Sequence, residues 1–514
     1  MIDLTFLVLM IPVLAIVLIG LFPSKSYAAI RAVTWIAMTA ELILSLLLVF
    51  LFDRSQKGFQ FVTELTWTQK PNIALHLGVD GISLWFVLLT SIVGFAALFA
   101  TGSIQERVKG FFLSYFALVI GALGTFMSLD LFFFFFFYEI EALVTYPLIS
   151  IWGRGDRRYA AMQFTIFSVL GSAFVLIGIL AIYFLTGKST LDFPALLELF
   201  RTSPLTMNLQ HGIFGVFLIG FGILAALWPF HAWGPIGYAD APPAASMMFA
   251  GVMKKLGAYG LIRLGFMLFP ETAQIWSPLI AGLALMNLIY VGFVALAQKD
   301  LRYLIGYSSS SHMGFVLIGL ACSSVLGLSG ALLVMFAHGI LVALFFLLLY
   351  VLEQNSVGTL FGDVGGLATK WPVTAACFSL AALAASGVPG FANFAGEIIV
   401  LFAVWDRYGW LTAGVLIAIV ITALYMLRAI RNIFFGPEKV TRQIQDEPLA
   451  NPFKKIAFVT LVGVLLFVGF FPNILLGYFG QSFLGIDQRQ ETRDQRLIEK
   501  APAQSQVLGP KSRV

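Results

Sequence analysis

Apolar runs of about 20 residues recur along the chain and are separated by short polar breaks. Because an α-helix rises 1.5 Å per residue, a run of this length crosses the roughly 30 Å of hydrocarbon in a bilayer. About fourteen spans are predicted in this way, at about 4–22, 29–52, 82–101, 110–128, 130–151, 160–186, 212–233, 241–268, 275–298, 302–322, 325–352, 371–404, 410–434 and 456–480. The sequence therefore predicts an all-α integral membrane protein that is embedded in the lipid bilayer.

The composition excludes an ordinary soluble domain. Of the 514 residues, 60% are hydrophobic and 11% are charged, whereas soluble domains carry roughly 25% charged residues. The formal net charge is +5, but no basic face or nucleic-acid motif accompanies it, so no nucleic-acid partner is expected. Cys322 and Cys377 lack metal-type spacing, and the chain has no P-loop or dinucleotide glycine fingerprint. We expect neither a metal nor a cofactor in this chain.

The distribution of Lys and Arg predicts the orientation. If the first loop faces the cytoplasm, the seven inner loops carry about sixteen cations and the outer loops about six. The positive-inside rule then places both termini outside. One polytopic domain is expected over 1–486, with a small extramembrane hairpin at about 57–80, where apolar and polar residues alternate around Lys70-Pro71-Asn72. The tail 487–514 is polar and has the composition of a disordered segment.

Two of the predicted spans contain helix breakers. Span 7 holds Trp228-Pro229 and further prolines, and span 12 holds the run Ser386-Gly-Val-Pro-Gly-Phe391. Proline removes an amide donor and crowds the preceding turn, so each span is expected to be a broken helix. Such backbone is tolerated at membrane depth where protein buries it or where it lines a cavity. The breaks lie five spans apart, which predicts two inverted five-helix repeats, spans 4–8 and 9–13.

Ionisable side chains inside the predicted spans are the candidates for chemistry. They are Asp130, Glu139, Glu141, His231, Lys254, Lys255, His312, His338 and Glu397. Charged groups are costly in a bilayer, so they are expected to face a protein-lined or hydrated interior. Because Lys, His and Glu can each exchange a proton and shift the pKa of a neighbour, their spread over several spans predicts a proton relay.

The neighbouring pairs among these candidates cannot face the same way. Glu139 and Glu141 point roughly 200° apart on a helix, so one of them, preferably Glu139, is predicted to be the functional acid. Lys254 and Lys255 lie about 100° apart, so one faces the interior while the other can snorkel or pair. His231, beside the break in span 7, has an alternative role in capping freed carbonyls.

Several motifs carry a family resemblance over about residues 75–440. They are Leu77-Gly-Val-Asp-Gly-Ile-Ser-Leu84, the segment from Asp130 to Glu139, Pro229-Phe-His-Ala-Trp233, Gly251-Val-Met-Lys-Lys-Leu-Gly-Ala-Tyr-Gly-Leu-Ile-Arg263, Tyr307-Ser-Ser-Ser-Ser-His-Met-Gly-Phe315 and Val388-Pro-Gly-Phe-Ala-Asn-Phe-Ala-Gly-Glu397. With them the chain resembles the antiporter-like membrane subunits of respiratory complex I, most closely the chain M or subunit 4 type. The resemblance implies a bundle of fourteen helices with inverted repeats.

The resemblance also implies roles for individual residues. Glu139 matches the span 5 glutamate, Lys255 the central lysine of span 8, His312 and His338 the linking histidines, and Glu397 the terminal acid of span 12. Glu141 and Lys254 receive no role from the resemblance.

The chain departs from the family pattern at two places. Leu224 stands where the span 7 lysine that pairs with the span 5 glutamate is expected, and Gln163 stands at the basic position of span 6. A buried carboxylate without its cation loses the Coulomb attraction that keeps it ionised. Either Lys254 or Lys255 compensates, or the coupling of this subunit is altered.

The expected function is that of a proton-translocating membrane-arm subunit of an NADH (or ferredoxin):quinone oxidoreductase of the complex I type. By the resemblance, NADH, FMN, Fe–S clusters and quinone belong to partner subunits, and the expected location is a bacterial inner membrane. The alternatives are a subunit of a multi-subunit Na⁺/H⁺ antiporter, a membrane subunit of an energy-converting hydrogenase, and a structural subunit that has lost pumping.

Overall fold

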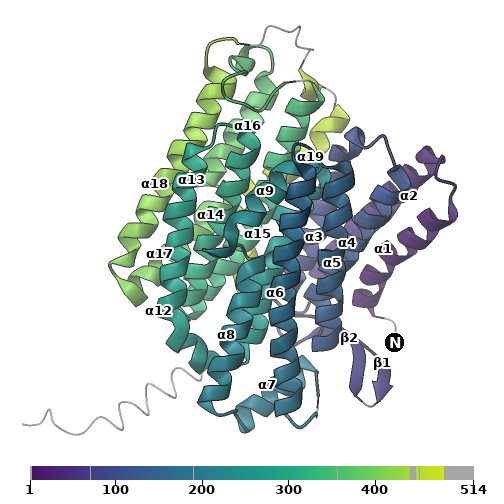
Figure 1. Ribbon diagram of the computed structural model, residues 1–514, viewed down its shortest axis with the longest axis vertical. Coiled ribbons are helices and arrows are strands. Elements are labelled where there is room, and N and C mark those ends of the chain that lie inside the picture. Colours follow the sequence, from purple (N-terminus) through teal and green to yellow (C-terminus); the bar gives the residue numbers. More distant parts are fainter. Residues whose placement is uncertain are drawn as a thin grey trace, which may run out of the picture.

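The computed structural model describes residues 3–69, 71–188, 190–355, 357–439, 447–450 and 452–479 as a bundle of long helices (Figure 1). The longer helices are α1 (Leu4–Leu21), α2 (Tyr27–Leu51), α3 (Ser83–Ala97), α4 (Val108–Met127), α5 (Leu131–Trp152), α6 (Arg157–Leu185), α8 (Met207–Leu224), α12 (Pro270–Met286), α14 (Leu301–Ala321), α15 (Val325–Gln354), α17 (Ala392–Tyr408), α18 (Leu411–Ile430) and α19 (Pro452–Phe470). The shorter ones are α7 (Phe193–Thr202), α9 (Trp233–Asp240), α10 (Pro243–Met248), α11 (Lys254–Gly260), α13 (Gly292–Ala297) and α16 (Pro372–Ala385).

Short 3₁₀ and π segments extend or connect these helices. The 3₁₀ segments are η1 (Leu98–Ser103), η2 (Phe230–Ala232), η6 (Leu367–Thr369) and η8 (Pro448–Ala450). The π-helical segments are η3 (Phe249–Met253), η4 (Leu261–Met267), η5 (Asn287–Val291) and η7 (Arg431–Phe435).

Within the described residues, 11 helices are long and apolar enough to cross a membrane, and a twelfth span results if the pair Lys455–Phe470 and Asn473–Phe479, bent by 69°, is taken as one. The protein is therefore an all-α, multi-pass membrane protein. Two of the predicted runs, 241–268 and 371–404, are not among these helices. The first is built of alternating α and π segments from Pro243 to Met267, and the second is divided into α16 and α17. The predicted tail 487–514 lies outside the described residues.

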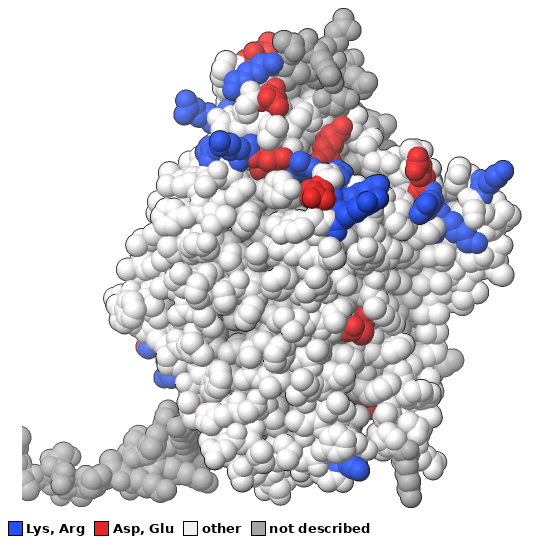
Figure 2. Space-filling model, viewed as in Figure 1, with Lys and Arg blue, Asp and Glu red and all other residues white. Residues whose placement is uncertain are grey.

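Charged side chains are unevenly distributed over the surface. In the view of Figure 2, Lys, Arg, Asp and Glu gather at one end of the molecule, above a broad apolar band. Ion pairs among the described residues include Arg154 with Glu353 and the exposed pair Lys370 with Glu438. Arg154 follows α5 and Glu353 lies in the last turn of α15, whereas Lys370 precedes α16 and Glu438 follows η7. All four lie at or beside loops that the sequence predicts to be cytoplasmic.

The break after α8 is held by a buried asparagine. Asn287 Oδ1 accepts a hydrogen bond from the Trp228 amide, and Asn287 Nδ2 donates to the carbonyls of Ala226 and Ser310. The first two bonds satisfy backbone groups that a continuous helix would have paired. The third ties the break to α14, the helix that carries the serine run.

The break between α16 and α17 depends on glycine. Gly387 and Gly390 have φ of +68° and +100°, values that L side chains rarely adopt. A Cβ on Gly387 would also lie 2.7 Å from Glu397 Oε2. Two glycines thus let the chain turn immediately beside a buried carboxylate.

Strands β1 (Gln60–Gln69) and β2 (Asn72–Val79) form an antiparallel hairpin in which Leu65 pairs with Leu75. A buried ion pair fastens the end of this hairpin to the bundle. Arg263 Nη1 and Nη2 donate to Asp80 Oδ2 and Oδ1 over 2.8 and 2.5 Å. The strands therefore join the helices at η4, a part of the helical run that also carries both lysines.

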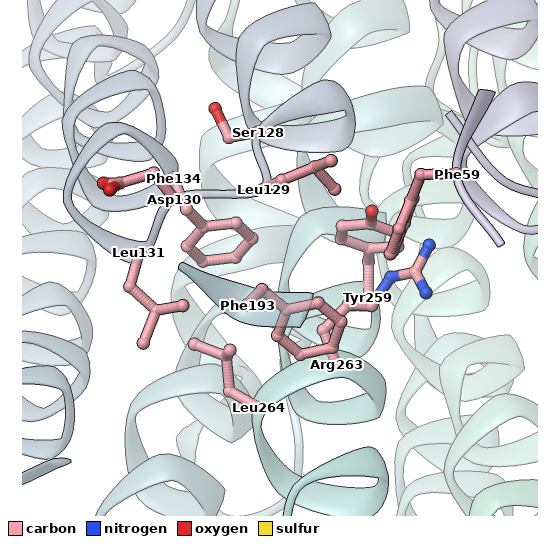
Figure 3. Close-up of a pocket in the computed structure, with 10 residues that line it drawn as sticks. All are labelled: Phe59, Ser128, Leu129, Asp130, Leu131, Phe134, Phe193, Tyr259, Arg263 and Leu264. Atoms are coloured by element: carbon pink, nitrogen blue, oxygen red, sulfur yellow. The ribbon is translucent and has the colours of Figure 1, made fainter. Parts of the chain in front are cut away.

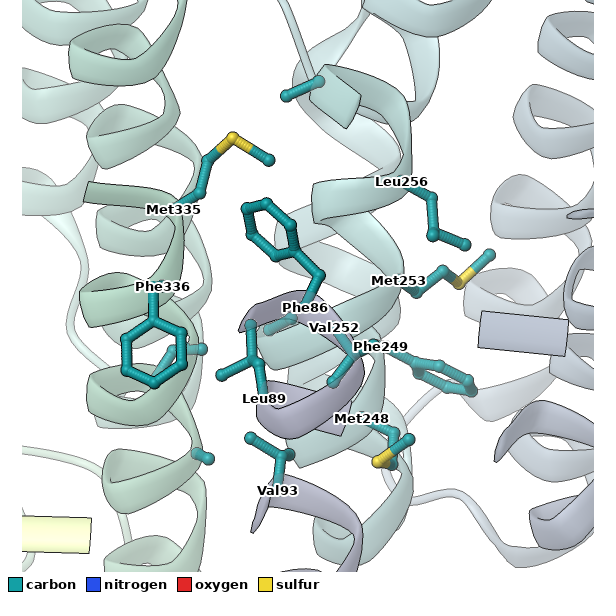
Figure 4. Close-up of a cluster of buried hydrophobic side chains, with 14 of the residues drawn as sticks. Phe86, Leu89, Val93, Met248, Phe249, Val252, Met253, Leu256, Met335 and Phe336 are labelled. Atoms are coloured by element: carbon teal, nitrogen blue, oxygen red, sulfur yellow. The ribbon is translucent and has the colours of Figure 1, made fainter. Parts of the chain in front are cut away.

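The apolar core joins α3, the α10–η3 run and α15. Figure 4 shows Phe86 and Leu89 of α3 between Met248 and Phe249 on one side and Met335 and Phe336 on the other. The backbones of η3 and α15 come together at two glycines, since a Cβ on Gly339 would lie 2.7 Å from the Gly251 carbonyl oxygen. Small residues permit such close helix contacts in membranes. This contact brings His338, the neighbour of Gly339, opposite Lys255.

Candidate functional site

Lys255 and His338 form the first link of a buried row of ionisable side chains. Lys255 Nζ lies 2.8 Å from His338 Nδ1 and also donates to the Ala250 carbonyl. Both side chains are almost fully enclosed, with 0% and 2% of their surface exposed. An amine and an imidazole at hydrogen-bond distance can exchange a proton without a rearrangement of the backbone.

The row continues from His338 to His312 and Glu397. The two imidazole rings have centroids 5.6 Å apart, and His312 Nδ1 lies 3.6 Å from Glu397 Oε1. The second distance is slightly longer than a hydrogen bond, so a small side-chain rotation would complete the link. The row thus joins α11, α15, α14 and α17, four helices from distant parts of the sequence.

A small cavity adjoins the two histidines. Its lining includes Ser308, Ser309, His312 and His338, and it has room for roughly one water molecule. Ser308 Oγ lies 3.0 Å from the Tyr425 hydroxyl, so a hydroxyl chain reaches from the cavity into α18. The serine run thus provides polar groups at the point where the row bends from α15 to α14.

Lys254 points away from Lys255 and toward the serine run. Its Nζ donates to Ser309 Oγ and Ser310 Oγ over 3.0 and 3.2 Å and lies 4.6 Å from the centroid of the Tyr238 ring. Both lysines are fully buried, so neither one snorkels to a membrane surface. The π segments η3 and η4 flank α11, the seven-residue helix that begins with this pair. Such local widening of a helix is frequent at functional sites.

Glu139 and Glu141 diverge as their spacing predicts. Glu139 is half-buried and lies against Ser172 of α6, whereas Glu141 is fully buried beside Gly121 of α4. Neither Glu141 oxygen has a hydrogen-bond partner in the described part of the chain. Gln163, at the second departure from the family pattern, lies on α6 and has a buried Oε1 that is also unpartnered among the described residues.

Two further predicted candidates, Asp130 and His231, also lie apart from the row. Asp130 caps α5 by accepting hydrogen bonds from the amides of Phe132 and Phe133. Figure 3 shows the pocket beside it, which Tyr259 and Arg263 also line. His231 lies in η2 at the first break, and its ring is edge-on to the Tyr290 ring, with 6.0 Å between the two ring centroids.

The sequence analysis did not single out four buried polar side chains that the structure shows. Asn287, Asp80 and Arg263 are described above, and the fourth is Glu41. Glu41 is fully buried on α2 and accepts hydrogen bonds from Ser45 Oγ and Ser91 Oγ, each over 3.3 Å. A carboxylate in the middle of the predicted span 29–52 was the available signal. No group of three His, Cys, Asp or Glu side chains that could hold a metal ion is found in the described ranges.

Comparisons with known proteins agree on one family. Residues 128–422 match the family model described as NADH:quinone oxidoreductase/Mrp antiporter, TM. NAD(P)H-quinone oxidoreductase chain 4 1 of Synechococcus elongatus is 34% identical over 479 residues, which cover 91% of this chain and 88% of the relative. NADH-quinone oxidoreductase subunit M of Rhodobacter capsulatus is 32% identical over 482 residues, which cover 91% of this chain and 92% of the relative.

A solved structure gives the same result. A chain in the structure of respiratory complex I from Thermus thermophilus with bound NADH superposes with a TM-score of 0.83 and 25% sequence identity. The match covers 94% of this chain and 99% of that one.

Proposed function

Because the chain belongs to the family of antiporter-like membrane subunits of NADH:quinone oxidoreductase, in its subunit M or chain 4 branch, we propose that it carries protons along Glu139, Lys255, His312, His338 and Glu397. It is a membrane subunit of an NADH- or NAD(P)H-quinone oxidoreductase, part of the proton-pumping arm of a complex I-type assembly. The electron-carrying cofactors and the quinone site belong, in this proposal, to other subunits.

One observation supports the proposal most strongly, namely the buried row from Lys255 to Glu397. Every link in it joins groups that can hold a proton, and every member is at most 3% exposed. Burial of four titratable groups is costly unless they are paired or used. Because the row runs through four helices with these short separations, a role in proton transfer is favoured over packing.

Proton movement along the row needs only small changes at each step. The Lys255 ammonium gives a proton to His338 Nδ1, and the imidazolium passes one to the neighbouring His312. His312 Nδ1 then protonates Glu397, whose position beside the Gly387 turn gives the proton a route through irregular backbone. Glu139, which lies apart beside Ser172, is the proposed entrance.

The proposed architecture has fourteen spans. Twelve of them are the spans counted above. The other two are the continuous helical run of Pro243–Met267 and the α16–α17 pair. The two breaks then lie in spans 7 and 12 of inverted repeats formed by spans 4–8 and 9–13. With both termini outside, as the positive-inside rule favours in a bacterial inner membrane, the charged end in Figure 2 faces the cytoplasm.

The test uses the whole complex in inverted membrane vesicles. Lys255→Met and Glu397→Gln remove a proton carrier with little change in volume, and each is expected to lower the number of protons pumped per electron. Complex assembly and quinone reduction are measured in the same vesicles. An assembled complex that pumps at the wild-type ratio in both variants would contradict the proposal.

A further inference from the structure

Glu41 is a fully enclosed carboxyl group that the proton row does not use. It lies on α2 with 0% of its surface exposed, and it takes part in none of the ion pairs found among the described residues. Its Oε2 is buried and has no hydrogen-bond partner in the described part of the chain. An ionised carboxylate without a cation is costly at membrane depth, so this environment favours the neutral acid.

The two serines beside Glu41 cannot supply a proton for every contact in the group. Glu41 Oε1 lies 3.3 Å from both Ser45 Oγ and Ser91 Oγ, and the two hydroxyl oxygens lie 2.7 Å apart. Ser91 Oγ also lies 3.2 Å from the Val87 carbonyl oxygen. These four contacts share two hydroxyl protons, because each hydroxyl donates only once. A proton on the Glu41 carboxyl group is a third donor, so three of the four contacts can be hydrogen bonds at the same time.

The group joins α2 to one side of α3, and the opposite side of α3 faces the row. Ser91 is the member of the group that lies on α3. Leu89 and Val93, two residues before and after it, point roughly the opposite way, because residues two apart on a helix are separated by about 200°. Figure 4 shows these two side chains between Phe336 of α15 and Met248 of α10.

This opposite side of α3 packs against the glycine contact that places the first link of the row. An added Cβ on Gly339 would lie 2.8 Å from Leu89 Cδ2, and one on Gly251 would lie 3.3 Å from Val93 Cγ1. Gly251 and Gly339 are the residues at which η3 and α15 meet. Because such interiors are closely packed, a shift of α3 away from α2 would be felt at this contact.

We propose that Glu41 is a positioning residue for the proton row. As a neutral carboxylic acid it holds α3 to α2 through Ser91, and α3 in turn holds together the backbones that carry Lys255 and His338. The acid gives up no proton during turnover, and its O–H group remains a hydrogen-bond donor throughout. The positioning role rests on the proposed function, whereas the neutral state of Glu41 does not.

The charge state is tested by infrared spectroscopy of the assembled complex. Glu41→Gln removes this one carboxyl group, so the difference between the variant and wild-type spectra isolates it. The expected difference at neutral pH is the loss of one protonated carboxyl band. Loss of carboxylate bands instead would overturn the neutral acid.

The positioning role is tested by the number of protons pumped per electron in inverted vesicles. Glu41→Leu keeps a similar volume without a polar group, and Ser91→Ala removes the hydroxyl that α3 contributes. Both are expected to lower the ratio, by up to the loss in Lys255→Met, while quinone reduction continues. Ser91→Ala serves even if Glu41→Leu fails to assemble. Glu41→Gln retains a neutral donor and acceptor and is expected to keep the wild-type ratio.

Thr39→Val is the matched control, since it removes a hydroxyl from the exposed side of α2 and is expected to pump like wild type. A double variant separates positioning from an independent loss. If Ser91 acts through the row, Ser91→Ala with Lys255→Met is expected to lose no more than Lys255→Met alone.

The positioning role is refuted if assembled Ser91→Ala pumps like wild type while Lys255→Met does not, or if Thr39→Val loses as much as Ser91→Ala. A ratio in Glu41→Gln as low as that in Glu41→Leu would also refute it. A wild-type ratio in Lys255→Met contradicts the row itself, an outcome distinct from failure of the positioning role.

Discussion

The buried Asp80–Arg263 pair offers the sharpest prediction about stability. The side chains are 8% and 4% exposed, and they share two parallel hydrogen bonds. Asp80 Oδ1 also accepts bonds from the amides of Ile82 and Ser83 at the start of α3. Removing one member of a buried pair costs about 3–5 kcal/mol, and losing the helix-start bonds costs about 1 kcal/mol more.

Asp80→Ala is therefore expected to destabilise the protein by about 4–6 kcal/mol. For a chain of this size that corresponds to a fall of about 4–6 °C in the unfolding midpoint. The midpoint is measured on the detergent-solubilised complex by following a fluorescent tag on this subunit through size-exclusion chromatography after stepwise heating. The exposed pair Lys370–Glu438 is the control, and Lys370→Ala is expected to change stability by less than about 1 kcal/mol.

A double-mutant cycle separates the pair from its surroundings. Arg263→Met leaves a buried carboxylate without its cation, whereas the double variant Asp80→Asn with Arg263→Met buries no charge. The double variant is expected to lose less stability than the sum of the losses in Asp80→Asn alone and Arg263→Met alone. Full additivity, or single variants with the midpoint of wild type, would refute the reasoning.

Three further predictions concern single positions. Gly257→Ala places a Cβ 2.6 Å from the Ala225 amide nitrogen, so it is expected to force α8 and α11 apart and to cost about 1–3 kcal/mol of stability. In the same thermal assay Gly282→Ala is expected to be neutral, because no atom lies within 4 Å of the added Cβ. Asn287→Ala leaves the Trp228 amide and the Ala226 carbonyl at the first break without a partner. Each unpaired group is expected to destabilise the protein by about 1–3 kcal/mol, and an unfolding midpoint equal to that of wild type would contradict this. Burial lowers the pKa of His76, but its 2.5 Å hydrogen bond to Asp192 and the charge of that aspartate outweigh burial and leave the pKa raised above 6.5. The contact therefore stabilises fully below pH 6.5 and loses its effect as the pH rises through the raised pKa, so midpoints measured across this range are expected to fall less in His76→Gln than in wild type.

Much of the architecture follows from the sequence because bilayer thickness fixes the length of a span and proline fixes where helices break. Length and hydropathy located the helices, and the breakers near Trp228 and Pro389 lie where α8 and α16 end. The same rules read 241–268 as one span, and the structure has a continuous helical run from Pro243 to Met267, but they do not predict the π segments within it. There η3 and η4 change the number of residues per turn, and hydropathy carries no information about that change.

The partners of the candidate residues could not be predicted. Helix geometry predicts that Lys254 and Lys255 diverge, but which of them meets His338 depends on the contact between Gly251 and Gly339. That contact joins segments nearly ninety residues apart, so no local pattern reports it. Likewise the sequence favoured Glu139 over Glu141, and only the packing of α4 against α5 reveals that Glu141 is the more deeply enclosed of the two.

The central claim is that a proton reaching Glu397 has passed through Lys255. Infrared difference spectroscopy of the turning-over complex, with Glu397→Gln to assign the carboxyl band, observes that proton directly. The account predicts a Glu397 protonation signal in wild type that disappears in Lys255→Met while quinone reduction continues. A Glu397 signal of unchanged size in Lys255→Met would contradict it.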